Sequence, residues 1–113
     1  MSAPAEPPIE GYHAHVYYDE KTRAAAAAVR EAVAARFPVT LGRWRERPVG
    51  PHSCAMYQIA FAPGLFAELV PFLMRHHRGL SVFIHPLTGD DAADHSEHAL
   101  WLGRQLPLDL SKL

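Results

Sequence analysis

The chain has 113 residues, of which 49% are hydrophobic and 20% charged, with a formal net charge of −1. These values predict one soluble globular domain, and the absence of a basic stripe argues against nucleic acid as a partner. The single cysteine, Cys54, excludes an intramolecular disulfide and suits a reducing cytosol, so a cytoplasmic location is expected. There is no run of apolar residues long enough to span a membrane and no signal peptide, so no membrane partner is expected.

Periodicity and turn residues divide the chain into alternating strands and helices. Residues 11–18 alternate in the manner of a strand, and the alanine run within residues 20–36 has high helix propensity. Pro71 should kink the second helix or mark its true start. The predicted elements are, in chain order, a disordered lead-in (1–10), a strand (11–18), a helix (20–36), strands (39–46 and 53–61), a helix (64–76), a strand (80–85), a short helix capped by Asp94 that carries His95, His98 and Trp101, and a tail without clear signal (106–113).

The order β-α-β-β-α-β predicts an α+β fold, a ferredoxin-like sandwich formed by residues 11–113 as a single domain. We expect a four-stranded antiparallel sheet with strand order 4-1-3-2, two helices on one face, the other face open, and a C-terminal tail. The first strand should lie between the third and fourth. We expect the first and third strands to run parallel, so that both begin at the same edge of the sheet.

Histidines are the most informative residues, because imidazole is a common metal ligand and proton carrier. Strand alternation puts His13, His15, His52 and His85 on the open face, opposite the apolar residues that should face the helices. The predicted strand directions bring His13, His52 and His85 to one edge. We therefore expect these three to bind a metal, with His15 as acid/base or substrate contact. The choice between His13 and His15 as the ligand is open.

The other four histidines occur in two close pairs. An isolated histidine at the end of an element is most often a surface residue, and His76 and His77 fit that interpretation at the end of a helix. His95 and His98 are three residues apart, which would put them on one helical face. That face could fold over the open sheet or simply face solvent.

Several stretches of the chain also resemble one known family. The sequence resembles the DOPA 4,5-dioxygenase-like family of small aromatic ring-cleaving proteins, over nearly all of residues 11–113. The residues that carry the resemblance are Tyr12-His13-Ala14-His15-Val16-Tyr17-Tyr18, Leu41-Gly42-Arg43, Val49-Gly50-Pro51-His52, Met56-Tyr57-Gln58-Ile59-Ala60-Phe61, Gly79-Leu80-Ser81, His85-Pro86, Asp94-His95 and Ala99-Leu100-Trp101-Leu102-Gly103.

The resemblance implies a ferredoxin-like fold, frequent dimerisation, and extradiol cleavage of a catechol by Fe(II) and O₂. Extradiol enzymes commonly use two histidines and one carboxylate. No carboxylate lies on the histidine face of the matched strands, so Glu97, Asp94 or Asp19 would have to reach in, or the site is all-histidine. An all-histidine site would also suit zinc as an occupant.

The preferred hypothesis is a metal-dependent dioxygenase acting on a small aromatic, DOPA-like catechol. His15 or His95 would accept and return the catechol proton, Arg43 could pair with a substrate carboxylate, and Tyr17 and His98 are candidate substrate contacts. The alternative is a non-catalytic, dimeric metal-binding or interaction protein that uses the same sheet face. Metal-dependent hydrolysis would use the same ligands, but no further residue pattern requires it.

Overall fold

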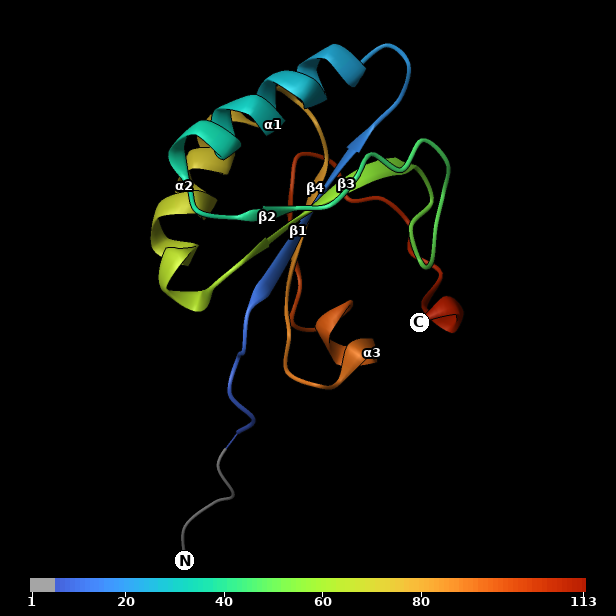
Figure 1. Cartoon of the computed structure of the whole chain (residues 1–113). Helices are drawn as coiled ribbons and strands as arrows, with labels where there is room; N and C mark the ends of the chain where they lie inside the picture. Colours follow the sequence, from blue (N-terminus) through green and yellow to red (C-terminus); the bar gives the residue numbers. More distant parts are fainter. Residues whose placement is uncertain (1–5) are drawn as a thin grey trace, which may run out of the picture.

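One antiparallel sheet organises the chain in the computed structural model, which describes residues 6–113 (Figure 1). Its strand order is β2-β3-β1-β4-β5. The strands are β1 (Tyr12–Tyr18), β2 (Thr40–Leu41), β3 (Ala55–Phe61), β4 (Val82–Pro86) and β5 (Leu100–Leu102), the helices are α1 (Arg23–Arg36), α2 (Phe66–His76) and α3 (Asp91–Asp94), and 3-10 turns occupy Pro63–Leu65 and Leu110–Lys112. The predicted α+β class and the order of the first four strands are confirmed, and β5 adds a fifth strand.

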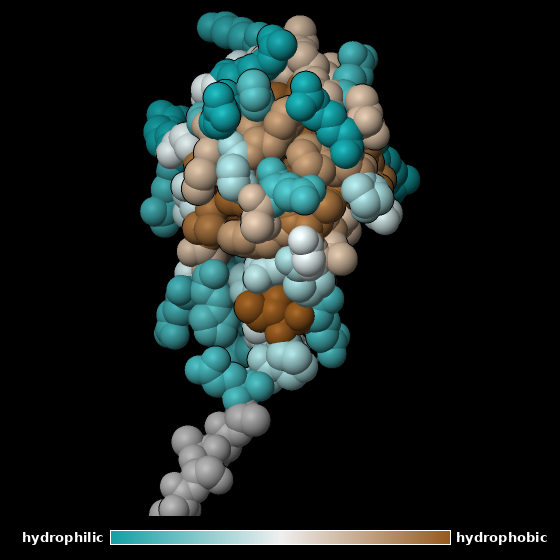
Figure 2. All heavy atoms as spheres, turned by 90° about the vertical axis from the view of Figure 1, so that its left-hand side faces the viewer, coloured by the Kyte–Doolittle hydropathy of each residue, from teal (hydrophilic) through white to brown (hydrophobic). Residues whose placement is uncertain are grey.

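Helices α1 and α2 cover one face of the sheet (Figure 1). Alternation in β1 turns Ala14 and Val16 toward them, and both are fully buried. They pack with Val29 and Val33 of α1 and with Leu73 of α2 in the main hydrophobic core. Seen from the helix side, apolar side chains gather over the upper part of the molecule, with hydrophilic side chains around them (Figure 2).

Helix α2 runs through Pro71. Proline removes one backbone donor in a helix, which leaves the carbonyl of Ala67 without its usual partner. Both residues are exposed, so water can bind this carbonyl. The helix predicted over residues 64–76 is present, with a 3-10 turn first and the α-helix from Phe66, so the alternative that Pro71 marks its true start is wrong.

The expected parallel run of the first and third strands is wrong. Strand β1 pairs antiparallel with β3 in the register Tyr12↔Phe61 and antiparallel with β4 in the register Tyr12↔Pro86. His52 precedes β3 and lies beside the end of β1, whereas His13 lies near its start. The direction of β3 therefore separates His52 from His13 along β1.

The histidine face of the sheet is covered rather than open. A second apolar cluster packs there, formed by Tyr17, Met56 and Phe83 with partly buried residues of the tail. The tail reaches the loop before β3 through a bridge between His52 and Leu108, and these two segments lie side by side in Figure 1.

The short helix also differs from its prediction. Helix α3 ends at Asp94, and its N-cap is Asp90, whose side chain accepts a hydrogen bond from the backbone of Ala93. Trp101 lies on β5, where it pairs with Phe83 of β4 and stacks on it with ring centres 4.7 Å apart.

The ends of the molecule add two observations. Residues 6–10 have no regular structure, and the backbone of Glu10 donates to Leu87, while the rest of the expected lead-in, residues 1–5, lies outside the described residues. Among residues 6–113, no helix has both the length and the apolar character needed to cross a membrane.

Candidate metal centre

Three histidines from two neighbouring strands meet on the covered face. His13 of β1 pairs directly with His85 of β4, and His15 lies two residues further along β1. Alternation gives all three the same face because residues opposite each other in a pair, and residues two apart on a strand, point the same way. The ring centre of His85 lies 5.2 Å from that of His13 and 5.2 Å from that of His15.

The donor atoms of this cluster are spaced for one metal ion. One ligand nitrogen from each of His13, His15 and His85 lies within 4.8 Å of the others. The Nε2 atoms of His15 and His85 are 3.1 Å apart. Two imidazole nitrogens bound tetrahedrally at 2.0–2.1 Å would be about 3.3 Å apart. The nitrogens of His15 and His85 are therefore already close to the spacing of two metal ligands, and the three histidines together could hold an ion such as zinc or iron.

Backbone carbonyls select which nitrogen of two imidazoles is free. His85 Nδ1 lies 3.0 Å from the Pro86 carbonyl, and His95 Nδ1 lies 2.8 Å from the Asp91 carbonyl. A carbonyl can only accept, so each Nδ1 carries a proton and donates it. In each ring Nε2 is then the nitrogen that can bind a metal or accept a proton, an arrangement typical of histidines at metal sites.

Burial keeps the clustered histidines uncharged. It lowers the pKa of His85 to about 4, against an ordinary value of 6.5, and lowers the pKa of His15 well below that value. Neighbouring imidazoles add to the effect on His15, first His52 and then His85. The pKa of His13, which is half-buried, is lowered by the same burial and by His95. Neutral imidazoles bind metals, so the cluster is ready to bind one at neutral pH.

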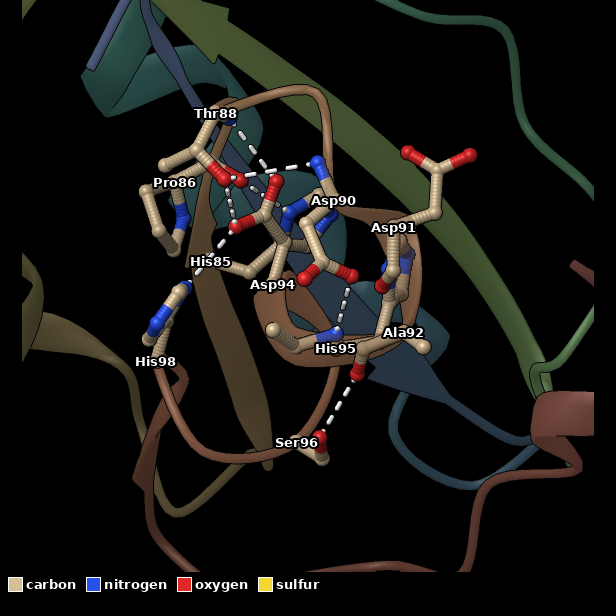
Figure 3. A network of polar contacts seen from close by, with 11 residues as sticks. His85, Pro86, Thr88, Asp90, Asp91, Ala92, Asp94, His95, Ser96 and His98 are labelled. Atoms are coloured by element: carbon tan, nitrogen blue, oxygen red, sulfur yellow. Dashed lines mark hydrogen bonds and ion pairs between the residues drawn. The ribbon is translucent and has the colours of Figure 1, made fainter. Parts of the chain in front are cut away.

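His95 completes one side of the cluster. Its ring centre lies 4.1 Å from that of His85 and 5.8 Å from that of Phe83. Helix α3 and the turn after β4 hold it there, and Figure 3 shows the hydrogen bonds of this segment. The sequence left open whether His95 faces the sheet or solvent, and the structure places it against His85.

A buried carboxylate, Asp94, ties the segment together. It accepts hydrogen bonds from the backbone and hydroxyl of Thr88, at 2.8 and 2.6 Å, and from His98 Nδ1 at 3.0 Å (Figure 3). Burial alone would raise the pKa of Asp94, but these hydrogen bonds outweigh it and hold the pKa below its ordinary value. The same contact raises the pKa of His98. His98 is thus turned to Asp94 and half-exposed.

No carboxylate joins the three clustered histidines within residues 6–113. Asp94 is already bonded to Thr88 and His98, and Asp19 is exposed and bonded to Thr22. Glu97 is also exposed. Of the two arrangements that the sequence left open, the structure favours the all-histidine site.

Two predicted site residues form a second group beside the cluster. His52 lies outside the group of three, but its ring centre is 4.3 Å from that of His15. Its Nδ1 is 2.6 Å from the hydroxyl of Tyr17, which is a buried residue. Burial raises the pKa of Tyr17, so the phenol stays protonated and donates to His52.

The last predicted site residue, Arg43, lines a cavity together with His15 and His52. Arg45 lines the same cavity and was not selected from the sequence. A signal for it existed, because residues 43 and 45 are two apart in an extended segment and so share a face. Asp94 was selected only as a cap or a distant ligand, and its true contacts depend on the turn after β4, which no local pattern predicts.

Comparison with known proteins extends these observations. The profile of the Dopa 4,5-dioxygenase family matches residues 12–112, which include every histidine of the cluster. The chain belongs to the Dopa 4,5-dioxygenase family. A crystal structure of a protein from Nostoc punctiforme PCC 73102, named as a candidate dioxygenase, is 50% identical and superimposes with a TM-score of 0.90 over 91% of this chain and 90% of that one.

Two curated relatives are longer than this chain. An uncharacterised 21.2 kDa protein of Botryotinia fuckeliana is 35% identical over 124 residues, covering 98% of this chain and 68% of that protein. A DOPA 4,5-dioxygenase of Amanita muscaria is 32% identical over 114 residues, covering 93% of this chain. The chain spans 50% of the Amanita protein's length.

Proposed function

We propose that this member of the Dopa 4,5-dioxygenase family is a metal-dependent extradiol dioxygenase that cleaves a small catechol with O₂. The observation that carries the proposal is the group of neutral imidazoles of His13, His15 and His85, spaced for one metal ion. His13 and His15 thus both become proposed ligands, and His52 a neighbour of the site. Fe(II) is the proposed native metal, and zinc is an alternative occupant.

The protein would supply three things to this chemistry. His13, His15 and His85 would hold the metal, and bound Fe(II) would act as a Lewis acid toward the catechol oxygens and bring O₂ to the same centre. His95, whose Nδ1 is fixed on the Asp91 carbonyl, would take the catechol proton on Nε2 and return it later. The packed rings of Phe83 and Trp101 would exclude water from one side. A homodimeric assembly and a cytoplasmic location stay predictions.

Metal binding can be tested before activity. Zinc titrated into metal-free protein should bind in a 1:1 ratio and raise the thermal midpoint, since a ligand that binds only the folded state stabilises it. His85→Gln and His15→Gln should each weaken binding by about ten- to a hundredfold or more. His76→Gln, an exposed histidine stacked on Phe72, is the matched control and should bind like wild type. Equal zinc affinity in all four proteins would contradict the proposed ligands.

Activity requires a separate experiment. Protein loaded anaerobically with Fe(II) should, on exposure to ¹⁸O₂ and a catechol, form a yellow semialdehyde that has gained both oxygen atoms. A panel of catechols with and without an amino acid side chain, DOPA included, would identify the substrate. If the protein binds one metal but cleaves none of the panel, the extradiol proposal is wrong, and a non-catalytic metal-binding role is favoured.

A further inference from the structure

The cavity that Arg43 and Arg45 line adjoins the histidine cluster on the side of β3. Its volume is about 230 Å³, and it lies between the sheet and the loop before β3. His15 and His52 form one wall, and Arg43, Arg45 and Gln58 line the rest together with backbone of that loop. The volume is below the roughly 300–1,000 Å³ of cavities for drug-sized ligands, which suits one small group.

A β-bulge turns the arginines toward this cavity. Leu41 pairs with Ile59, and Arg45 bridges Met56, so three residues (42–44) face two (57–58). Met56 of β3 pairs with Tyr17 of β1, which lies on the histidine face. Because directly paired residues share a face, Arg45, which pairs with Met56, lies on the histidine face too. The Arg30 guanidinium secures the bulge by donating to the Gly42 carbonyl at 2.8 Å.

Both arginines lack an anionic partner. Within residues 6–113 no salt bridge involves Arg43 or Arg45, whereas Arg23, on the opposite face, pairs with Glu46 at 2.7 Å. Arg45 is half-buried, whereas Arg43 is exposed. His15 Nδ1 is a buried side-chain nitrogen with no hydrogen-bond partner among the described residues, and it would become a donor once a metal ion occupied Nε2 of the same ring. The two arginines without a salt bridge therefore favour an anion in the cavity.

We propose that this cavity is an anion subsite that binds the carboxylate of an aromatic acid, with Arg45 as the main contact and Arg43 as the second. A planar carboxylate matches the guanidinium fork, and the few donors present suit a single negative charge better than a phosphate dianion. His15 borders both the cavity and the metal cluster. A ligand whose carboxylate binds in the cavity would therefore have its aromatic ring near the cluster. The link to ring cleavage rests on the proposed function, but the binding itself does not.

The test measures binding to metal-free protein, so it does not depend on activity. Benzoate and 3-phenylpropionate are titrated by calorimetry, with their neutral amides and inorganic phosphate as the other arms. Wild type should bind the carboxylates at least ten times more tightly than the amides or phosphate. Arg45→Met should weaken carboxylate binding by about ten- to a hundredfold and Arg43→Met by less, because hydrogen bonds to charged groups are among the stronger ones.

Two further variants sharpen the result. Arg45→Lys keeps the charge but loses the planar fork, so intermediate affinity is expected. Arg47→Met removes an exposed arginine of the same segment that does not line the cavity, and its affinity should equal that of wild type. Denaturation midpoints confirm that each variant is folded.

Three results would overturn the subsite. They are equal binding of acids and amides by wild type, an equal loss in Arg47→Met and Arg45→Met, and tighter binding of phosphate than of either carboxylate. A protein that binds carboxylates through Arg45 but cleaves no catechol keeps the subsite and loses only the proposed function. If the protein cleaves neutral and acidic catechols with the same KM, and Arg45→Met leaves these KM values unchanged, the subsite is wrong and the proposed function stands.

Discussion

A single proton on each imidazole decides what the clustered histidines can do. In the metal-free protein His85 donates from Nδ1 to a carbonyl, so its Nε2 is a bare acceptor. The facing Nε2 of His15, 3.1 Å away, must then carry a proton, which leaves His15 Nδ1 as an acceptor without a partner. A metal ion bound at His15 Nε2 would require this proton to move to Nδ1, so the ring would stay neutral and the unpartnered acceptor would become a donor.

The hydroxyl of Tyr17 offers a test at the scale of one bond. Tyr17→Phe leaves the buried Nδ1 of His52 without its 2.6 Å partner and should lower the free energy of unfolding by about 1–3 kcal/mol. Urea denaturation measures the change. The control is Tyr12→Phe, since the Tyr12 hydroxyl makes no hydrogen bond within residues 6–113, and its effect should be close to zero. Equal effects of the two substitutions would show that the contact with His52 contributes nothing.

Gly103 provides a second test, because it combines a positive φ of 70° with a close backbone approach. A Cβ added there would lie 2.5 Å from the Leu80 carbonyl oxygen. Gly103→Ala should therefore destabilise the protein by about 2–4 kcal/mol, and it should loosen the pairing of β5 with β4. Gly79, with φ of 77° and nothing within 4 Å, is the matched control: Gly79→Ala should cost only the backbone strain, about 1–2 kcal/mol. Chemical denaturation of both variants measures the loss in the free energy of unfolding. Similar losses in Gly103→Ala and Gly79→Ala would show that the predicted clash with the Leu80 carbonyl does not occur.

Among the elements, the turn from β4 through α3 determines where His95 lies. Asp94→Asn removes the charge that accepts from Thr88 and His98, and should cost about 1–3 kcal/mol of stability. Hydrogen exchange should become faster in residues 88–98, because these hydrogen bonds hold the segment that carries His95. The pKa of His98, raised by this carboxylate, should fall toward 6.5 in an NMR titration.

Asp91→Asn is the control for that experiment. The Asp91 side chain is exposed and makes no hydrogen bond within residues 6–113, although its carbonyl holds His95. This variant should keep the exchange rates and the His98 titration of wild type. If Asp94→Asn behaves in the same way, Asp94 does not position His95.

The elements also show what the sequence could and could not predict. Alternation in β1 assigned Ala14 and Val16 to the helices and His13 and His15 to the other face, because parity is a local property of an extended chain. The direction of β3 depends on how the chain returns to the sheet. In an antiparallel sheet of this order neighbours must run in opposite directions, so the expected parallel pair, and with it the grouping of His13 with His52, was wrong.

Strand β5 and the Asp94 contacts were missed for a different reason. Leu100–Leu102 is too short for its period to distinguish strand from helix, and its pairing with β4 is a tertiary contact. Asp94 was expected to cap a helix because aspartate is common there, but Asp90 takes that role and leaves Asp94 to Thr88 and His98. Non-local partners decided both cases, and the cavity beside Arg45 depends on such partners as well.

For the whole molecule, the buried histidines predict how stability varies with pH. The pKa values of His52 and His85 are about 4 in the folded protein, against an ordinary 6.5 when exposed on unfolding. Between these values the unfolded chain binds more protons, so the stability of metal-free protein is complete above about pH 6.5 and falls as the pH drops toward 4. Each pKa unit corresponds to 1.36 kcal/mol, so the fall should amount to a few kcal/mol.

Urea denaturation of EDTA-treated protein at several pH values between 4 and 7.5 tests this prediction. His85→Gln should flatten the curve, because one group that must be neutral in the folded state is gone, whereas the exposed His76→Gln should leave its slope unchanged. A wild-type stability that stays constant from pH 6.5 to 4.5 would show that these imidazoles titrate normally in the fold.

The central position of β1 has a consequence for how the protein is made. Strand β1 is synthesised before every other strand, yet its partners are β3, near residue 60, and β4, near residue 85. A growing chain therefore carries His13 and His15 on a strand that has no partner until β3 has been added, and only one partner until β4 has been added. The proposed metal ligands come together only when β4 pairs with β1, so metal would bind after this pairing and would not guide the earlier steps of assembly.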